Sequence, residues 1–140
     1  MALNFEYTAD GLVLCSQHFS ASELACPCGK CKSGMDENFM LLLEGLRTQL
    51  EFALIVTSGY RCPEHNMAVA ETGIDGPHTH RRAVDLAIQN GRDAYTLLQR
   101  ALRIGFTGIG LKQHGEDRNK RIVHLDNLTS PPRPNVWTYK

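Results

Sequence analysis

Two short apolar runs carry ionisable side chains at positions that a strand would bury. The runs are "AVDLAI", residues 83–88, and "RIVHLD", residues 121–126. Alternate side chains of a strand share a face, so His124 and Asp126 lie with Ile122 on one face, opposite Val123 and Leu125. A carboxylate such as Asp85 is costly to bury unless a partner holds its charge. Burial of these polar groups would therefore require partners for them.

If the two runs pair as neighbouring strands, Asp85 and His124 can meet, and His78 can close over them from the loop seven residues before Asp85. Two imidazoles and a carboxylate, with a water in the fourth position, form the ligand set of a catalytic zinc site. Spacing alone leaves the ordinary alternatives open, which are a solvated loop histidine and a strand aspartate at a sheet edge.

The rest of the pattern mixes helices and strands with short connections. A capped helix with a leucine-rich face is expected over residues 36–52, and a second helix over residues 92–104 that ends at Gly105. Pro63 fits the first turn of a short helix. Further strands are expected at 53–58 and at "GIGLK", 108–112, which lies near enough to 121–126 to form a hairpin. We predict an α+β fold with a mainly antiparallel sheet flanked by helices.

Length and charge bound the remaining possibilities. A chain of 140 residues fits one domain, so residues 1–140 are expected to form a single domain. Lys+Arg and Asp+Glu balance at 15 each, so the overall charge does not indicate nucleic acid or an anionic membrane as a partner. No membrane span and no signal peptide are predicted, and synthesis in the cytoplasm is expected.

The chain has five cysteines, three of them in "CPCGKC", and they are Cys15, Cys26, Cys28, Cys31 and Cys62. An odd number without a signal peptide argues against a full disulfide framework. Three alternatives stay open. The three clustered thiols could bind a structural zinc together with Cys15, Cys62 or His18, they could form a disulfide, or they could remain reduced in a tight turn.

Three separated pieces of the sequence, in a fixed order, resemble a known family. They are "TSGYRCPEHN", then "HTHRRAVD", then "GIG" followed by "VHLD". Together they resemble the zinc D-Ala-D-Ala carboxypeptidase family of peptidoglycan peptidases, which shares its fold with the Hedgehog signalling domain. The small members from phages and prophages are most similar, and their amino-terminal part resembles "HFSASELACPCGKC". The resemblance covers roughly residues 15 to 128.

The resemblance implies a Hedgehog-like fold and a role for individual residues. The family motif SxHxxGxAxD, whose His and Asp bind zinc, falls on His78 and Asp85, and the later histidine ligand falls on His124. The arginine of SGYR, which holds the terminal carboxylate of the substrate, falls on Arg61. A guanidinium suits that role because it can bind a carboxylate through two hydrogen bonds. His80 lies outside the motif and is expected at the pocket rim or in solvent.

Three positions depart from the family pattern. Gly76 replaces the motif serine, which costs a supporting hydrogen bond. Arg81 replaces the motif glycine, and an arginine at a positive φ angle would be strained by about 1 kcal/mol. Arg121 stands where many relatives have a Glu or Asp as general base. We therefore predict Asp126 as the base, with the alternative that it orients a zinc ligand. Glu116 and Asp117, in a charged turn, are further candidates for the base.

The resemblance implies that residues 1–140 form a single zinc peptidase domain, which cuts peptidoglycan stem peptides as a D,D-carboxypeptidase or an endopeptidase. It would act on the cell wall after release or as part of a phage particle. One alternative is a metal-binding or structural module of the same fold without turnover, which Arg81 and Arg121 would permit. Another is an interaction domain whose zinc site is "CPCGKC" itself.

Overall fold

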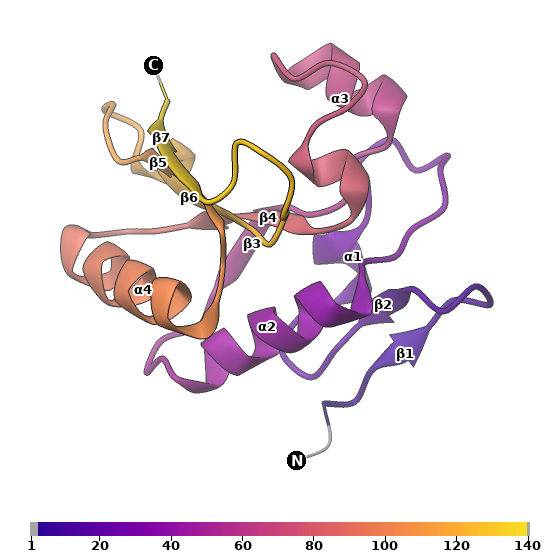
Figure 1. The fold of residues 1–140 in the computed structure, drawn as a ribbon, viewed down its shortest axis with the longest axis horizontal. Coiled ribbons are helices and arrows are strands. Elements are labelled where there is room, and N and C mark those ends of the chain that lie inside the picture. Colours follow the sequence, from indigo (N-terminus) through magenta and orange to yellow (C-terminus); the bar gives the residue numbers. More distant parts are fainter. Residues whose placement is uncertain (1–2, 140) are drawn as a thin grey trace.

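A five-stranded sheet forms the centre of the computed structural model, which describes residues 3–139. The strand order is β3-β4-β6-β5-β7, and every neighbouring pair is antiparallel except β5 with β7. The bounds are β3 (Ile55–Ser58), β4 (Ala83–Ala87), β5 (Gly108–Lys112), β6 (Ile122–Asp126) and β7 (Asn135–Thr138). Helices flank this sheet (Figure 1), so the predicted α+β class with a mainly antiparallel sheet is confirmed.

Helices α2 (Glu37–Thr48) and α4 (Gly91–Ile104) lie beside each other on one side of the sheet (Figure 1). Asp36 caps α2 by accepting from the Phe39 backbone N–H at 2.9 Å. The helix ends at Thr48 rather than at residue 52, and Leu50 enters the core from the turn that follows. Helix α4 ends as predicted at Gly105, whose φ of 118° suits glycine. Leu97 and Ala101 of this helix are buried, whereas Leu102 is 64% exposed.

The amino-terminal part is tied to α2 through a buried charge. It contains β1 (Glu6–Tyr7), β2 (Val13–Cys15) and the short helix α1 (Ala21–Leu24). Glu44, fully buried on α2, accepts hydrogen bonds from the Ser16 hydroxyl at 2.6 Å and the His18 backbone N–H at 2.8 Å. The His18 ring also pairs with Glu44 at 2.6 Å. Because these donors satisfy the carboxylate, it can interrupt the leucine-rich face.

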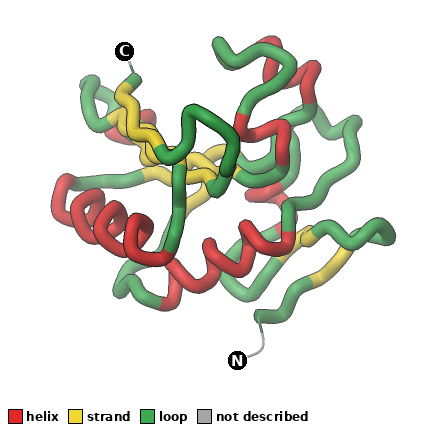
Figure 2. The backbone as a smooth tube through the Cα atoms, in the orientation of Figure 1, coloured by secondary structure: helices red, strands yellow, loops and turns green. Residues whose placement is uncertain are grey.

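The two faces of the central strands have different partners. Val84, Leu86, Val123 and Leu125 belong to the apolar core, as the alternation predicts. The opposite face carries Asp85 and His124, and it is bordered by α3 (Pro63–Val69) and the short 3₁₀ helix η1 (Pro77–His80). The loop over 127–134 crosses between β6 and β7 (Figure 2). Over residues 3–139, no helix has the length and apolar character that a membrane span needs.

Candidate metal centre

The register between β4 and β6 brings Asp85 opposite His124. The two residues are direct partners in this antiparallel pair, and the His124 Nδ1 atom lies 3.0 Å from Asp85 Oδ1. The expectation that the strands carrying Asp85 and His124 are neighbours is confirmed. Both side chains are almost completely buried, so the contact is shielded from water.

His78 reaches the same carboxylate from η1. Its Nε2 atom lies 3.2 Å from Asp85 Oδ1, and its ring centroid lies 5.1 Å from that of His124. The structure thus brings together the three residues that the sequence singles out as metal ligands. His80, two residues later, is exposed and pairs with Asp75 at 2.7 Å, so it lies outside this cluster.

The three candidate donor atoms are spaced as a tetrahedral metal ion requires. One atom each from His78, Asp85 and His124 lies within 4.8 Å of the other two. Zinc bonds of 2.0–2.1 Å place neighbouring ligand atoms about 3.3 Å apart. The two imidazole–carboxylate separations, 3.0 and 3.2 Å, are close to that value.

The second nitrogen of each imidazole is held by an acceptor. The Gly59 carbonyl oxygen lies 2.7 Å from His78 Nδ1, and an Asp126 oxygen lies 2.8 Å from His124 Nε2. A carbonyl can only accept, so His78 donates from Nδ1, and Nε2 is the ring atom directed at Asp85. A carboxylate does the same for His124. Metal-binding histidines in proteins are usually oriented in this way.

The electrostatics of the cluster favour a cation. Burial alone raises the pKa of Asp85, but hydrogen bonds from His124 and His78 outweigh it and hold the pKa well below its usual range. Burial lowers the pKa of His124, and the hydrogen bonds to Asp126 and Asp85 outweigh that effect and raise it. Two buried carboxylates around one imidazole therefore stabilise positive charge, which a divalent ion would supply.

Asp126, the predicted general base, lies behind His124. It is fully buried, and Arg133 Nε and Nη2 donate to its two oxygens at 3.0 and 2.9 Å. Burial raises its pKa, but the bonds from His124 and Arg133 outweigh it and lower the pKa to about 2. This geometry fits the alternative role, orienting a ligand, better than that of a base that must reach a water. Glu116 and Asp117 lie in an exposed turn.

Arg61 lies beside the cluster with unused donors. Its Nη2 atom is 3.9 Å from Asp85 Oδ2, and its side chain is only 14% exposed. Its buried Nε has no hydrogen-bond partner among the described residues. A buried donor without a partner is unfavourable, so the site can gain from an anionic ligand at this place.

Arg81 has the positive φ angle that its place in the motif predicts. It ends η1 with a φ of 64°, which strains a residue other than glycine. Its guanidinium donates to the carbonyls of Gly34 and Lys32 at 2.8 and 3.2 Å. It also lies 3.8 Å from the ring centroid of Tyr60. These contacts offset the strain and fasten the 32–34 loop to the segment that carries Arg61.

The other motif departure has a steric reason. A side chain at Gly76 would collide with Thr72, so the serine of the family pattern does not fit here without a shift. The Thr79 hydroxyl bonds to the Gly76 carbonyl at 2.7 Å and braces the same turn.

The glycines of "GIG" make room for the residues behind the cluster. Gly108 faces Asp126 across the β5–β6 pair, and a side chain there would collide with the carboxylate. Gly110 faces His124, and a Cβ atom there would lie 2.6 Å from Trp137 Nε1. The Trp137 ring centroid is 5.1 Å from that of His124. The sequence does not predict a role for Trp137 or Arg133, for which the paired glycines are the one indirect signal.

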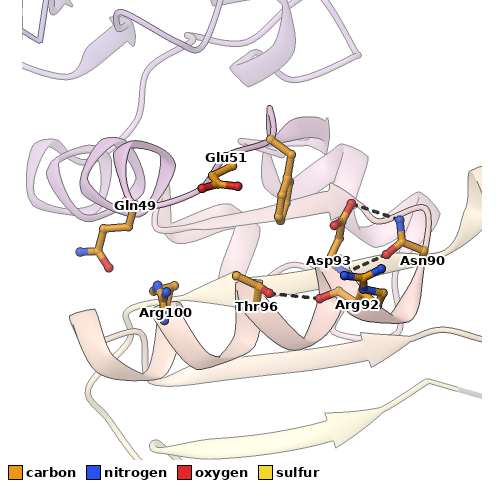
Figure 3. Close-up of a pocket in the computed structure, with 8 residues that line it drawn as sticks. Gln49, Glu51, Asn90, Arg92, Asp93, Thr96 and Arg100 are labelled. Atoms are coloured by element: carbon orange, nitrogen blue, oxygen red, sulfur yellow. Dashed lines mark hydrogen bonds between the residues drawn. The ribbon is translucent and has the colours of Figure 1, made fainter.

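A surface pocket lies away from these residues, between the chain that follows α2 and the exposed side of α4 (Figure 3). Its polar groups brace α4, since Asn90 accepts from the Asp93 backbone N–H at 2.8 Å and Thr96 donates to the Arg92 carbonyl at 3.2 Å. The lining does not include His78, Asp85 or His124. It consists of Gln49, Glu51, Phe52, Asn90, Arg92, Asp93, Thr96 and Arg100.

Comparison with known proteins gives one family. The family model described as "Peptidase M15" matches residues 17–126, which is more than half of the chain. No curated protein matches the chain. The match ends at Asp126, so Arg133 and Trp137 lie beyond it.

Gly108→Ala tests the space behind the cluster. The added methyl group must displace the Asp126 carboxylate, so we expect a loss of about 2 kcal/mol in the free energy of unfolding and metal affinity at least about 10-fold weaker. Thermal unfolding and a metal titration measure both. Gly91→Ala is the control, because nothing lies within 4 Å of its Cβ position. Equal effects of the two substitutions would contradict the explanation.

Arg81 provides a test that separates strain from contact. Arg81→Ala keeps the strained φ and loses every guanidinium contact, so we expect a destabilisation of about 1–2 kcal/mol. Arg81→Gly also loses the contacts but relieves the strain, and should be about 1 kcal/mol more stable than the alanine variant. Chemical denaturation of the three proteins measures the difference. If the glycine variant is the less stable of the two, strain at this position is not significant.

Proposed function

The chain belongs to the M15 family of metal-dependent peptidases, and from this we propose that it is a zinc-dependent peptidase that hydrolyses stem-peptide bonds of peptidoglycan. The observation that carries the proposal is the convergence of His78, Asp85 and His124 with Arg61 beside them. Such an enzyme would act on the cell wall after release or as part of a phage particle.

Zinc is the metal that we propose for this cluster. Two imidazole nitrogens and one carboxylate oxygen are a usual donor set for catalytic zinc, with one position left open. When bound, zinc would act as a Lewis acid on the scissile carbonyl and would lower the pKa of water. Its ligands would be His78, Asp85 and His124.

The other residues would hold this arrangement and the substrate. The Gly59 carbonyl keeps the His78 ring turned toward Asp85, and Asp126 does the same for His124. We propose orientation, rather than proton transfer, as the role of Asp126, because His124 and Arg133 already occupy its oxygens. Rigid ligands lower the reorganisation that the reaction requires.

Arg61 favours a carboxypeptidase over an endopeptidase. Its partly unsatisfied guanidinium lies next to the cluster and is suited to a carboxylate at the end of a peptide. A peptide whose last carboxylate binds Arg61 would have its terminal bond near the metal. Removal of the terminal D-Ala from a stem peptide is therefore the reaction that we propose first, with endopeptidase cleavage as its alternative.

One observation favours a second candidate, a module of the same fold without turnover. Arg121, where many relatives have a carboxylate base, is committed to its turn, because Nη2 donates to the Gly115 carbonyl at 2.6 Å. Together with the occupied Asp126, this leaves the proton acceptor of the reaction without an assigned residue.

Digestion of a labelled muropeptide, followed by mass spectrometry, tests the proposal. We expect the wild-type protein to release one D-Ala and His124→Ala to lose both cleavage and one equivalent of zinc, because a ligand is missing. His80→Ala is the matched control, since this exposed histidine lies outside the cluster and its loss should leave cleavage unchanged. Zinc bound by His78, Asp85 and His124 with no cleavage of any muropeptide would select the inactive module.

Arg61→Ala distinguishes the two modes of cleavage. For a carboxypeptidase we expect kcat/KM to fall by about 100-fold or more on peptides with a free terminal carboxylate. Peptides with an amidated terminus should be poor substrates of both proteins. Arg118→Ala, at an exposed arginine, is the control. Unchanged kcat/KM in Arg61→Ala would argue for an endopeptidase.

A further inference from the structure

Four of the five cysteines meet at one place, apart from the cluster described above. The sulfur atoms of Cys26, Cys28, Cys31 and Cys62 all lie within 4.8 Å of one another. Three come from the turn after α1, and Cys62 stands immediately before α3. Cys26 and Cys62, which are buried, are separated by 36 positions in the sequence, so only the fold brings them together.

The separations of the sulfur atoms match a tetrahedral metal site. They are 3.4 Å for Cys28–Cys31, 3.8 Å for Cys26–Cys62 and 3.8 Å for Cys28–Cys62. Four sulfur atoms each about 2.3 Å from a zinc ion lie about 3.8 Å from one another. Cys28 lies near two other sulfur atoms, whereas a disulfide joins each sulfur to one other. Disulfides therefore explain the cluster less well than a shared metal ion does.

The turn that carries three of these residues is built to present sulfur. Gly29, with a φ of 69°, lets the chain reverse between Cys28 and Cys31. The backbone N–H of Lys30 donates to Cys28 Sγ at 3.4 Å, and that of Cys62 donates to Cys26 Sγ at 3.4 Å. Such bonds orient sulfur ligands and stabilise their negative charge. Lys30 and Lys32 place positive charge in the same loop, which complements a tetrathiolate site.

We infer that Cys26, Cys28, Cys31 and Cys62 bind a structural zinc ion, separate from the metal centre of His78, Asp85 and His124. Four protein ligands leave no open position, so this ion would take no part in the chemistry. Cys15 is excluded, because it lies on β2 and its thiol contacts Glu6 at 3.3 Å.

The position of Cys62 indicates what the ion would hold. Cys62 directly follows Arg61, and the preceding Tyr60 donates its backbone N–H to the Leu24 carbonyl at 2.9 Å. Arg61 itself has a longer backbone bond, 3.3 Å, to the His78 carbonyl. The ion would cross-link this short segment to the turn after α1 and so keep Arg61 in place beside Asp85.

Metal analysis of four purified full-length proteins tests the inference. We expect two zinc ions per chain in the wild type and in Cys15→Ser, and one in Cys31→Ser. His124→Ala should retain one ion, whose X-ray absorption spectrum shows sulfur neighbours only. The second ion of the wild type is the one proposed for His78, Asp85 and His124, so the count of two rests on the proposed function. If that centre fails to bind, the wild type should keep one ion with sulfur neighbours, unaffected by His124→Ala, which supports the present inference alone.

The spectrum of His124→Ala keeps the test decisive even where Cys31→Ser does not fold. Nitrogen or oxygen neighbours around the retained ion, iron in place of zinc, or four cysteines paired in disulfides by mass spectrometry would each overturn the inference. Thiol titration adds a second readout. We expect one reactive thiol before treatment with a chelator and five after it, and five before treatment would contradict the inference.

Stability should follow the same pattern. Because the ion binds only the folded chain, we expect Cys31→Ser or a chelator to lower the unfolding midpoint of His124→Ala by about 5 °C or more. Cys15→Ser, the control in the same background, should leave the midpoint unchanged. An equal shift for both cysteine variants would argue against a metal at the four-cysteine cluster.

Discussion

The buried carboxylate of Asp85 is the charge around which this structure is arranged. An isolated carboxylate in the middle of a sheet is strongly unfavourable, and this one is compensated from three directions, by His78, His124 and Arg61. Each partner requires a different part of the fold to be in place. The β4–β6 register supplies His124, η1 supplies His78, and the segment after β3 supplies Arg61. The site and the sheet register are therefore one constraint.

A second layer of contacts keeps those partners rigid. Arg133 holds Asp126, which in turn holds His124, and "GIG" leaves the space that this arrangement needs. Arg133 belongs to the segment beyond the family match, so this segment supports a cluster whose three proposed metal ligands all lie inside the match. Breaking such a buried pair leaves a charge uncompensated, which is why the closing segment matters for the centre as well as for the sheet.

The sequence predicts what depends on local rules, and fails where distant segments meet. Alternation along the strands predicts that Asp85 and His124 share a site, and capping predicts where α4 ends. No local rule places the closing strand β7 beside β5, so the sequence does not connect Arg133 with Asp126. The positive φ of Arg81 follows from its motif position, whereas its compensation by Tyr60 depends on the tertiary structure. For the same reason, the sequence left three candidates for a fourth partner of "CPCGKC".

The segment 59–62 contributes both to the cluster of four cysteines and to the surroundings of the cluster of His78, Asp85 and His124. Gly59 orients His78, Tyr60 packs against Arg81, Arg61 faces Asp85, and Cys62 joins the sulfur cluster. A segment outside regular helix or strand would fluctuate if it were anchored on one side only. Anchored from both sides, it can keep an unsatisfied guanidinium next to a buried carboxylate. A metal ion at the four cysteines would thus hold Arg61 in the position that binding of an anionic ligand at the histidine cluster requires.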